Sequence, residues 1–367
     1  MTGTGAIPES VVPGAGSHAV PQSADGGKPF ATRAGVRRLV HAAVAGPSVH
    51  NTQPWRFRRV DDATMDLYAD LDRLLAVTDP MGRGLGISCG AALFNLRLAI
   101  RMTGHNPEVL PLPDPGERPD LLATVRATPG SPPDQDERLL YGMIPHRRTN
   151  RLPFDGRPLP RNVFLDLVTA AYTEGATLVL VNGRTARRVL DMVAVAEGTL
   201  AAEASYRAEL ARWTGSEARS DGVPEHAFGP RPRNGELPMR DFALGGAQTV
   251  RDRRPGAASE PVREQADFEP DPQIAALFTK GDSPLDWLRA GQALQRVLLT
   301  ATAHGAAASL FSQPLDLRPP QHRGDHAGPL GHLQMLIRLG YGPPVPRVPR
   351  RPVFEVLNLR TREARRG

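Results

Sequence analysis

Cysteine is almost missing from this sequence, which has a single thiol, Cys89, among its 367 residues. One cysteine excludes an intrachain disulfide and a zinc site built on several thiolates. The neighbours of Cys89 in GISCGAALF are small or apolar, which indicates a packed core thiol. The chain also has no run of about 18 apolar residues, and its first 30 residues lack a signal-peptide pattern. We therefore expect a cytoplasmic protein that does not span a membrane.

Lysine is scarce too, with only Lys28 and Lys280, so arginine supplies nearly all of the positive charge. The formal net charge is +6, but residues 347–367 hold seven arginines against two glutamates and account for +5 of it. The rest of the chain is close to neutral. It has no basic helical stripe and no interleaved aromatics of the kind on which single-strand binders stack bases. We therefore expect no nucleic-acid partner.

Several common enzyme motifs are absent as well. No GxGxxG follows a predicted strand, and neither a GxSxG nucleophile elbow nor a GxxxxGK[ST] phosphate loop occurs. His322 and His326 are four residues apart, but Gly324 and nearby prolines argue against a helix that would present them together. These absences exclude the usual hydrolase and nucleoside-triphosphate sites and leave no candidate metal ligands.

Hydrophobic periodicity divides the chain into a leader and two halves. Residues 1–30 are rich in Gly, Ala, Ser and Pro without periodicity, which predicts a disordered leader. Residues 31–140 form the first predicted half, and residues 141–367 repeat its plan. The predicted elements are a helix over 33–45, a hairpin over 55–70, a helix over 88–102, a helix, glycine turn and strand over 161–181, and a helix over 287–305.

The two halves differ in length by an insertion. Ala42 pairs with Ala170 at an offset of 128 residues, whereas Gly90 pairs with Gly291 at an offset of 201. The difference of 73 residues falls in 215–283, a stretch heavy in Gly, Pro and Arg. A disordered linker is one interpretation, but long loops in compact proteins are usually functional, and MRDFALGG and QIAALFTKG offer apolar anchors. We predict a lid here, within an α+β fold of two tandem half-repeats.

Polar side chains crowd the junction between the first helix and the hairpin, in GPSVHNTQPWRF. Ser48, Asn51 and Gln53 offer donors and acceptors on a loop whose torsions are restrained by Pro47 and Pro54. Such a loop can grip a planar ligand with polar edges. A well-capped helix end is the structural alternative, because these residue types also favour turns.

Two arginine-rich stretches lie farther along the chain. HRRTNRLPF contains Arg147, Arg148, Thr149 and Arg151, and PRRPVFEVL contains Arg350 and Arg351. Arginine binds phosphate through bidentate contacts, to which a threonine hydroxyl can add. A solvated basic face is the alternative for each stretch. Convergence of both on one anion indicates a phosphate-bearing planar ligand that needs no Rossmann site, a description that fits FMN.

These motifs resemble those of a known family. GPSVHNTQPWRF looks like the PSxxNxQPW signature of FMN-dependent nitroreductases, RRTNRLPF like their RxSxR stretch, and LIRLGYGPPVPRVPRRPVFEVL like their carboxyl-terminal ending. The likeness covers nearly the whole chain after the leader, and the double length is similar to the actinobacterial, dormancy-associated subgroup. It implies a nitroreductase-like fold in which the two half-repeats form a pseudo-dimer within one monomeric chain.

The resemblance also implies a role for each matching residue. The polar loop would lie along the flavin, and Arg151 would point toward the polar edge of its isoalloxazine ring. Arg147, Arg350 and Arg351 would bind the phosphate, and a loop at SLFSQPLD would present a backbone donor to flavin N5. Because the second half has no PSxxNxQPW, one FMN per chain is expected. The implied FMN-binding residues are Ser48, Asn51, Gln53, Arg147, Arg148, Thr149, Arg151, Ser312, Gln313, Arg350 and Arg351.

The activity implied by the resemblance is NAD(P)H-dependent reduction through FMN. NADPH or NADH would give hydride to flavin N5, and a nitroaromatic or quinone-like small-molecule acceptor would then take the electrons. The flavin would perform the chemistry, so no side chain need act as a catalyst. The alternative is a protein that stores or shields FMN without reductase turnover, because an immobile lid would block the nicotinamide.

Overall fold

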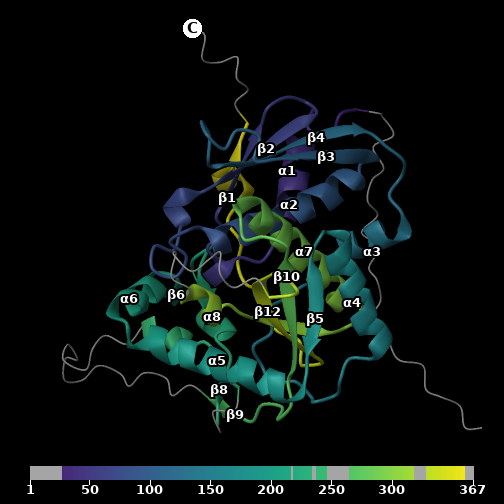
Figure 1. The fold of residues 1–367 in the computed structure, drawn as a ribbon. Helices are drawn as coiled ribbons and strands as arrows, with labels where there is room; N and C mark the ends of the chain where they lie inside the picture. The colour runs from purple at the N-terminus through teal and green to yellow at the C-terminus, as the bar shows by residue number, and fades with distance from the viewer. Residues whose placement is uncertain (1–26, 216–217, 234–236, 246–263, 318–327, 360–367) are drawn as a thin grey trace, which may run out of the picture.

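The structure is a computed structural model that describes residues 27–215, 218–233, 237–245, 264–317 and 328–359. Residues 1–26 of the predicted leader, His322, His326 and the arginines beyond residue 359 lie outside these ranges. Within them, the chain forms two mainly antiparallel sheets with helices packed between them (Figure 1). None of the described helices combines the length and apolar character needed to cross a membrane.

Four strands of the first half and one from the end of the chain form one of the sheets, in which the described strands are ordered β13-β1-β2-β4-β3. Strands β1 and β2 form the predicted hairpin, with Trp55 opposite Ala69. Trp55 and Phe57 are buried while Arg56 is exposed, the period-two pattern of a strand with one face on the core. The strands are β1 (Trp55–Arg59), β2 (Thr64–Ala69), β3 (His105–Pro111), β4 (Leu121–Pro129) and β13 (Leu357–Asn358).

The second half builds the other sheet, whose described strands are ordered β11-β12-β10-β5. Read from β5, the order is β5-β10-β12-β11. In both sheets, therefore, the first and second strands along the chain are neighbours, and the fourth strand lies between the second and the third. The strands are β5 (Thr177–Val181), β10 (Gln273–Thr279), β11 (Ala307–Phe311) and β12 (His332–Gly340).

The main helices form the layer between the sheets. Helix α2 packs on the first sheet and α7 on the second, and the two helices pack against each other (Figure 1). Helix α2 begins five residues before its predicted start at Ser88, because the Asp79 carboxylate accepts from the Gly84 and Leu85 amides and satisfies its first turn. The helices of the two halves are α1 (Arg33–Ala43), α2 (Arg83–Arg101), α3 (Gln135–Met143), α4 (Arg161–Thr173) and α7 (Pro284–Ala303).

Helices α2 and α7 cross at a pair of glycines. A Cβ on Gly90 would lie 2.2 Å from the carbonyl oxygen of Leu288, and one on Gly291 would lie 2.0 Å from that of Ile87. Backbone atoms cannot give way to such a group, so both positions require glycine. These two glycines are the pair from which equivalence of the two halves was inferred, and they meet at the centre of the molecule.

The insertion has different boundaries from the predicted 215–283. QIAALFT, predicted to anchor a lid, is strand β10, which lies between β12 and β5 in the second sheet. Only residues 60–63 separate β1 from β2, whereas residues 182–272 separate β5 from β10, so the insertion starts directly after β5. Composition misplaced it because a central strand is buried on both faces and shows no alternation. The described elements of the insertion are α5 (Gly183–Ala202), α6 (Ala204–Arg212), β6 (Thr214–Gly215), β7 (Val223–Pro224), β8 (Arg231–Pro232) and β9 (Gln265–Ala266).

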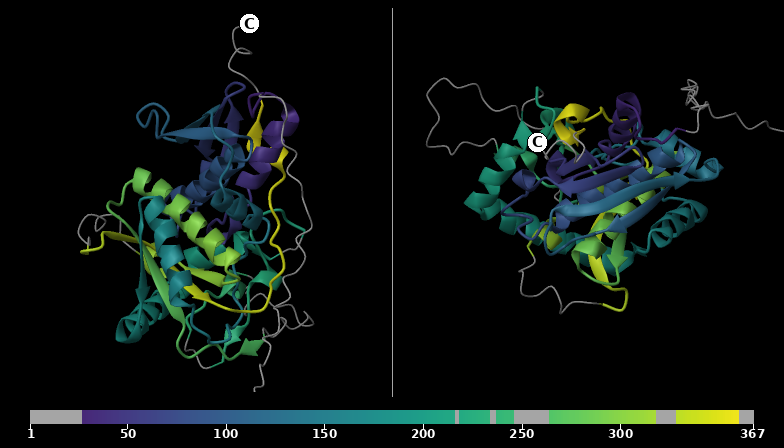
Figure 2. Two further views of the ribbon diagram at one scale, coloured as in Figure 1. Left: turned by 90° about the vertical axis from the view of Figure 1, so that its right-hand side faces the viewer. Right: turned by 90° about the horizontal axis from the view of Figure 1, so that it is seen from above.

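The end of the chain returns to the first sheet. After β12, residues 341–359 run from the second sheet along the molecule to the first, as the yellow segment in the left view of Figure 2 shows. They include α9 (Val353–Val356) and end in β13, which pairs in parallel with β1 through Phe57 and Leu357. This path places Arg350 and Arg351 in contact with the loop that follows α1.

Candidate functional site

A cavity that opens to solvent lies where the two halves and the insertion meet. Ile87 of α2 and Leu294 of α7 contribute its apolar lining. The structure brings most of the predicted site residues to this cavity, from segments up to 302 residues apart. Those that line it are Ser48, Asn51, Arg147, Arg148, Thr149, Arg151, Ser312 and Arg350.

The loop of residues 46–54, here called the motif loop, has an unusual backbone. His50, Asn51 and Gln53 have φ values of 47°, 54° and 51°, in the left-handed region that non-glycine residues rarely adopt. The Ser48 hydroxyl accepts from the Gln53 amide at 2.9 Å, and the Asn51 amide group donates to the Gly222 carbonyl at 2.8 Å. Strained residues of this kind persist where the surrounding contacts hold them, and they cluster at binding sites.

Four arginines that line the cavity are here called the arginine cluster: Arg147, Arg148, Arg347 and Arg350. The charged groups that act on Arg147, Arg148 and Arg350 are other arginines, and no carboxylate of the described chain pairs with these three. Like charges gathered in a cavity without counter-ions repel one another. The arrangement therefore favours an anionic ligand that would neutralise them.

Arg147 is the least satisfied member of the cluster. Its side chain is buried, and Nε and Nη1 have no hydrogen-bond partner among the described residues. Burial, and then the neighbouring charge of Arg148, lowers the pKa of Arg147 to about 10. A buried cation with unpaired donors is costly, so these atoms require an acceptor from outside the chain.

Arg350 is held in place by the motif loop and by the end of α1. It donates to the Asn51 side-chain oxygen at 3.0 Å and to the Val44 carbonyl at 3.1 Å. Its pKa is lowered to about 9, first by burial and then by Arg147, Arg347 and Arg148. Carbonyl oxygens orient this guanidinium without neutralising it, which leaves its charge available to a ligand.

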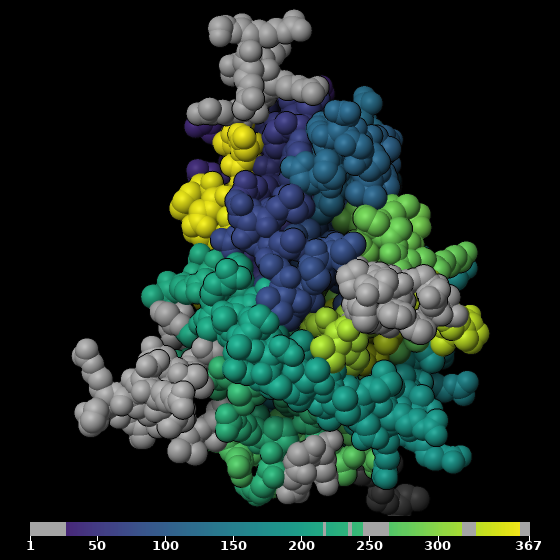
Figure 3. All heavy atoms as spheres, turned by 60° about the vertical axis from the view of Figure 1, so that its left-hand side comes forward, coloured from purple at the N-terminus to yellow at the C-terminus, as the bar shows by residue number. Residues whose placement is uncertain are grey.

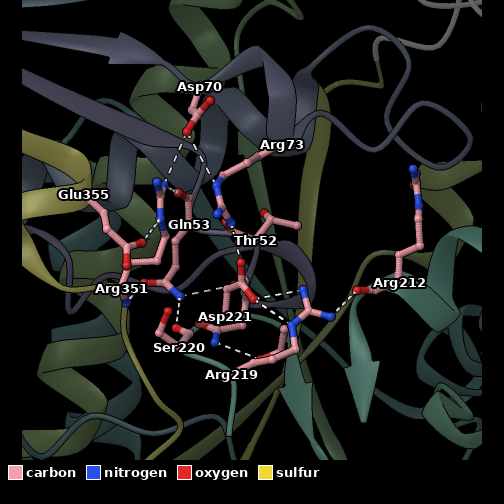
Figure 4. A network of polar contacts seen from close by, with 12 residues as sticks. Thr52, Gln53, Asp70, Arg73, Arg212, Arg219, Ser220, Asp221, Arg351 and Glu355 are labelled. Atoms are coloured by element: carbon pink, nitrogen blue, oxygen red, sulfur yellow. Dashed lines mark hydrogen bonds and ion pairs between the residues drawn. The ribbon is translucent and has the colours of Figure 1, made fainter. Parts of the chain in front are cut away.

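Three predicted residues do not line the cavity. Gln53 is fully buried, accepting from the Arg351 amide at 2.8 Å and donating to the Ser220 carbonyl at 2.9 Å (Figure 4). The Arg351 guanidinium lies within 3.3 Å of Asp70 (Figure 4). Gln313 is buried at the start of the short helix α8 (Gln313–Asp316). Gln53 and Arg351 thus join the motif loop to the carboxyl-terminal segment.

The insertion also contributes to the cavity lining. Val223, Met239, Arg240 and Phe242 line it, and the Phe242 ring lies 4.6 Å from the Arg151 guanidinium. The sequence interpretation missed Arg240 and Phe242 as site residues, although MRDFALGG was noted as an apolar anchor. It also missed His50 and Arg347, which stand within or next to the two matched motifs.

The described part of the insertion is fastened to the first half by buried contacts. The Glu209 carboxylate of α6 accepts from the Val77 and Thr78 amides at 2.8 and 3.0 Å. Asp221 pairs with Arg73 at 2.8 Å, as Figure 4 shows. In the space-filling view the teal surface of the insertion lies directly against the blue first half (Figure 3). These contacts favour an insertion that keeps a fixed position on the first half over one that moves as a free loop.

Known proteins resemble this chain over most of its length. Rv3131 of Mycobacterium tuberculosis, provisionally named an NAD(P)H nitroreductase, is 35% identical over 331 residues, which are 88% of this chain and 90% of that protein. The protein acg of the same organism, with the same provisional name, is 30% identical over 340 residues, 90% of this chain and 97% of its own. No protein-family model matches the chain.

Solved structures show a more distant likeness. The FMN-dependent nitroreductase NfnB of Mycobacterium smegmatis, in complex with NADPH, has a TM-score of 0.35 and 16% identity, over 61% of this chain and 98% of that one. A nitroreductase structure from Anabaena variabilis has a TM-score of 0.40 and 11% identity, over 76% of this chain and 69% of that one.

Proposed function

Since the chain belongs to the NAD(P)H nitroreductase family, we propose that it is an FMN-binding oxidoreductase that takes electrons from NADPH or NADH. The acceptor is a small molecule of the nitroaromatic or quinone class. FMN, when bound, supplies the hydride transfer, and the protein supplies binding, orientation and electrostatics. One FMN binds per chain, because GPSVHNTQPW occurs once.

The unpaired Nε and Nη1 groups of Arg147 carry this proposal. Among the described residues, Arg147 and the arginines around it have no carboxylate partner, which is the environment that a phosphate monoester would neutralise. Arg148, Arg347 and Arg350 complete the phosphate site, and each charge-assisted hydrogen bond contributes roughly 1.5–3 kcal/mol. Apolar Ile87 and Leu294 then offer a surface for a flat ring.

The remaining predicted residues would orient that ring. Ser48, Asn51 and Arg151 lie on the cavity wall with hydrogen-bonding groups suited to the polar edge of an isoalloxazine. Thr149 forms a β-bridge with Ala308, which fixes the chain between Arg148 and Arg151. Ser312 lines the cavity beside β11. Gln53 and Arg351 act by holding the motif loop and not by touching the cofactor.

A reduction assay tests the function. The purified protein is saturated with FMN, freed of oxygen and mixed with NADPH or NADH, while the flavin absorbance near 450 nm is followed. Loss of the absorbance, and its return on addition of a quinone, is the expected result. A protein that takes up no FMN would overturn the whole proposal.

FMN storage without turnover is the second candidate. It is favoured by the fixed insertion, because Val223, Met239 and Phe242 occupy one side of the cavity and leave less room for a nicotinamide ring to stack. In the same assay a storage protein would bind FMN but keep its absorbance with both nucleotides. Slow bleaching that becomes fast in Phe242→Ala, with Phe354→Ala as an exposed control, would show that the insertion limits access.

A further inference from the structure

His50 stands in the cavity wall with no role in the function proposed above. Its residue is 7% exposed, and its ring meets the Phe242 ring edge-on, with centroids 5.8 Å apart and an interplanar angle of 82°. Its φ of 47° shows that the backbone is held in an unfavourable conformation to place this side chain. The motif loop and the insertion therefore position the imidazole from two sides.

Arg240 determines which nitrogen of this ring carries the hydrogen. The Arg240 Nη1 group lies 3.0 Å from His50 Nε2, and a guanidinium can only donate. Nε2 must therefore accept, so the hydrogen of the neutral ring is on Nδ1. Burial, and then the charges of Arg240 and Arg151, lowers the pKa of His50 well below its usual value and keeps the ring neutral.

Arg240 is itself fixed on its other side. Its Nη2 group donates to the Asp316 carboxylate at 2.6 Å and to the Ser312 hydroxyl at 3.2 Å. Asp316 belongs to α8, which follows β11 of the second sheet, so the ring orientation depends on contacts from both halves and from the insertion. This anchoring leaves the imidazole little freedom to exchange its two nitrogens.

The Nδ1 atom has no hydrogen-bond partner among the described residues. We propose that His50 donates a hydrogen bond from Nδ1 to a carbonyl or nitro oxygen of the ligand that fills the cavity, with Arg240 as the positioning residue that fixes the tautomer. The proposal rests on the proposed function for the identity of the ligand, but not for the state of the ring. Two ligands could present the oxygen: the isoalloxazine of FMN, or the electron acceptor.

The state of the ring is tested first, on the protein without added ligand. Two-bond proton–nitrogen NMR spectra resolve histidine tautomers, the chain has ten histidines, and the His50 signal is the one lost in His50→Phe. We expect a single neutral tautomer with hydrogen on Nδ1 from about pH 6 to about pH 8. A ring with hydrogen on Nε2, or one that titrates in this range, would overturn the proposal even if FMN fails to bind.

The acceptor oxygen is identified with variants of the FMN-loaded protein. His50→Phe removes the donor, His50→Asn returns an amide donor near the Nδ1 position, and His41→Asn on the exposed face of α1 is the control. FMN affinity is measured by fluorescence, and KM is measured for 1,4-benzoquinone. Ferricyanide serves as an acceptor that takes electrons without such an oxygen.

Each source of the oxygen gives a different result. If it belongs to FMN, His50→Phe weakens FMN binding about 3- to 10-fold, the range of one neutral hydrogen bond. If it belongs to the acceptor, FMN affinity and the ferricyanide rate are unchanged, while KM for benzoquinone rises by a similar factor. In both cases His50→Asn recovers most of the loss. Unchanged FMN affinity together with unchanged KM in His50→Phe would overturn the proposal.

Discussion

Gly90 of α2 and Gly291 of α7 meet backbone to backbone, so that a Cβ on either would lie within 2.9 Å of the Cα of the other. The helices that join the two sheets can approach this closely only because both positions lack a side chain. The cavity depends on the same approach, since Ile87 and Leu294 line it from either side of the crossing.

Substitution of either glycine should therefore separate the two halves. We expect Gly90→Ala and Gly291→Ala each to lower the free energy of unfolding by about 3 kcal/mol, since overpacking against backbone outweighs the helix preference of alanine. Gly198→Ala in α5, where a Cβ would contact nothing within 4 Å, is the matched control and should be neutral or slightly stabilising. Urea unfolding measures all three, and equal stability of Gly90→Ala and Gly198→Ala would contradict the packing described.

Replacement of Arg147 should raise the stability of the ligand-free protein and weaken its binding of FMN. Arg147→Met removes a buried charge without a partner, so the ligand-free protein should gain about 1–2 kcal/mol of stability. FMN affinity should fall about 10- to 150-fold, the equivalent of one lost charge-assisted contact. Thermal unfolding with and without FMN measures both effects. Arg187→Met on the exposed surface of α5 should change neither, and a loss of stability in ligand-free Arg147→Met would mean that the guanidinium has a partner.

Gln53 should matter for stability and not for direct ligand contact. Gln53→Ala leaves the Arg351 amide and the Ser220 carbonyl without partners, so we expect a loss of about 2–4 kcal/mol in unfolding free energy. Below the unfolding temperature, FMN affinity should fall less than in Arg147→Met. A variant of normal stability that binds no FMN would place Gln53 in the ligand site after all.

His50 should make stability depend on acid pH. Its pKa is depressed in the folded protein, so the charged ring is favoured in the unfolded chain. The contribution of His50 to stability should therefore decline as pH falls below about 6.5, by up to about 1.4 kcal/mol per pH unit. In His50→Asn this contribution is absent, so the stability difference between the two proteins should shift in favour of the variant between pH 7.5 and pH 5. Parallel urea midpoints for both proteins over that range would contradict a buried neutral ring.

The sequence predicted the elements that carry strong periodicity. The first helix, the hairpin β1–β2 and the long helices α2 and α7 occur where apolar spacing places them, and eight of the eleven predicted site residues line one cavity. The motif resemblance predicted these residues because a motif specifies residue types at fixed spacing along the chain. It could not distinguish Ser48, which lines the cavity, from Gln53, which is buried behind the loop, because the left-handed torsions of His50, Asn51 and Gln53 are not evident from the motif.

The sequence predictions fail where the position of a residue depends on contacts with distant parts of the chain. Strand β10 was assigned to the insertion because a central strand lacks the alternation of an edge strand. Arg240 and Phe242 belong to the insertion, in which α5 packs against α8 and α6 contacts the first half, and no local pattern predicts these contacts. His50 stands at a variable position of the motif, so its pairing with a residue 190 positions away could not be predicted.

A comparison of FMN with riboflavin tests the central claim most directly, because the two ligands differ only in the phosphate that the arginine cluster is proposed to bind. Isothermal titration of the purified protein should give one FMN per chain and an affinity at least about 100-fold higher than that of riboflavin, the equivalent of about two charge-assisted contacts. Equal affinities, or no binding of FMN, would show that Arg147 and its neighbours do not form a phosphate site.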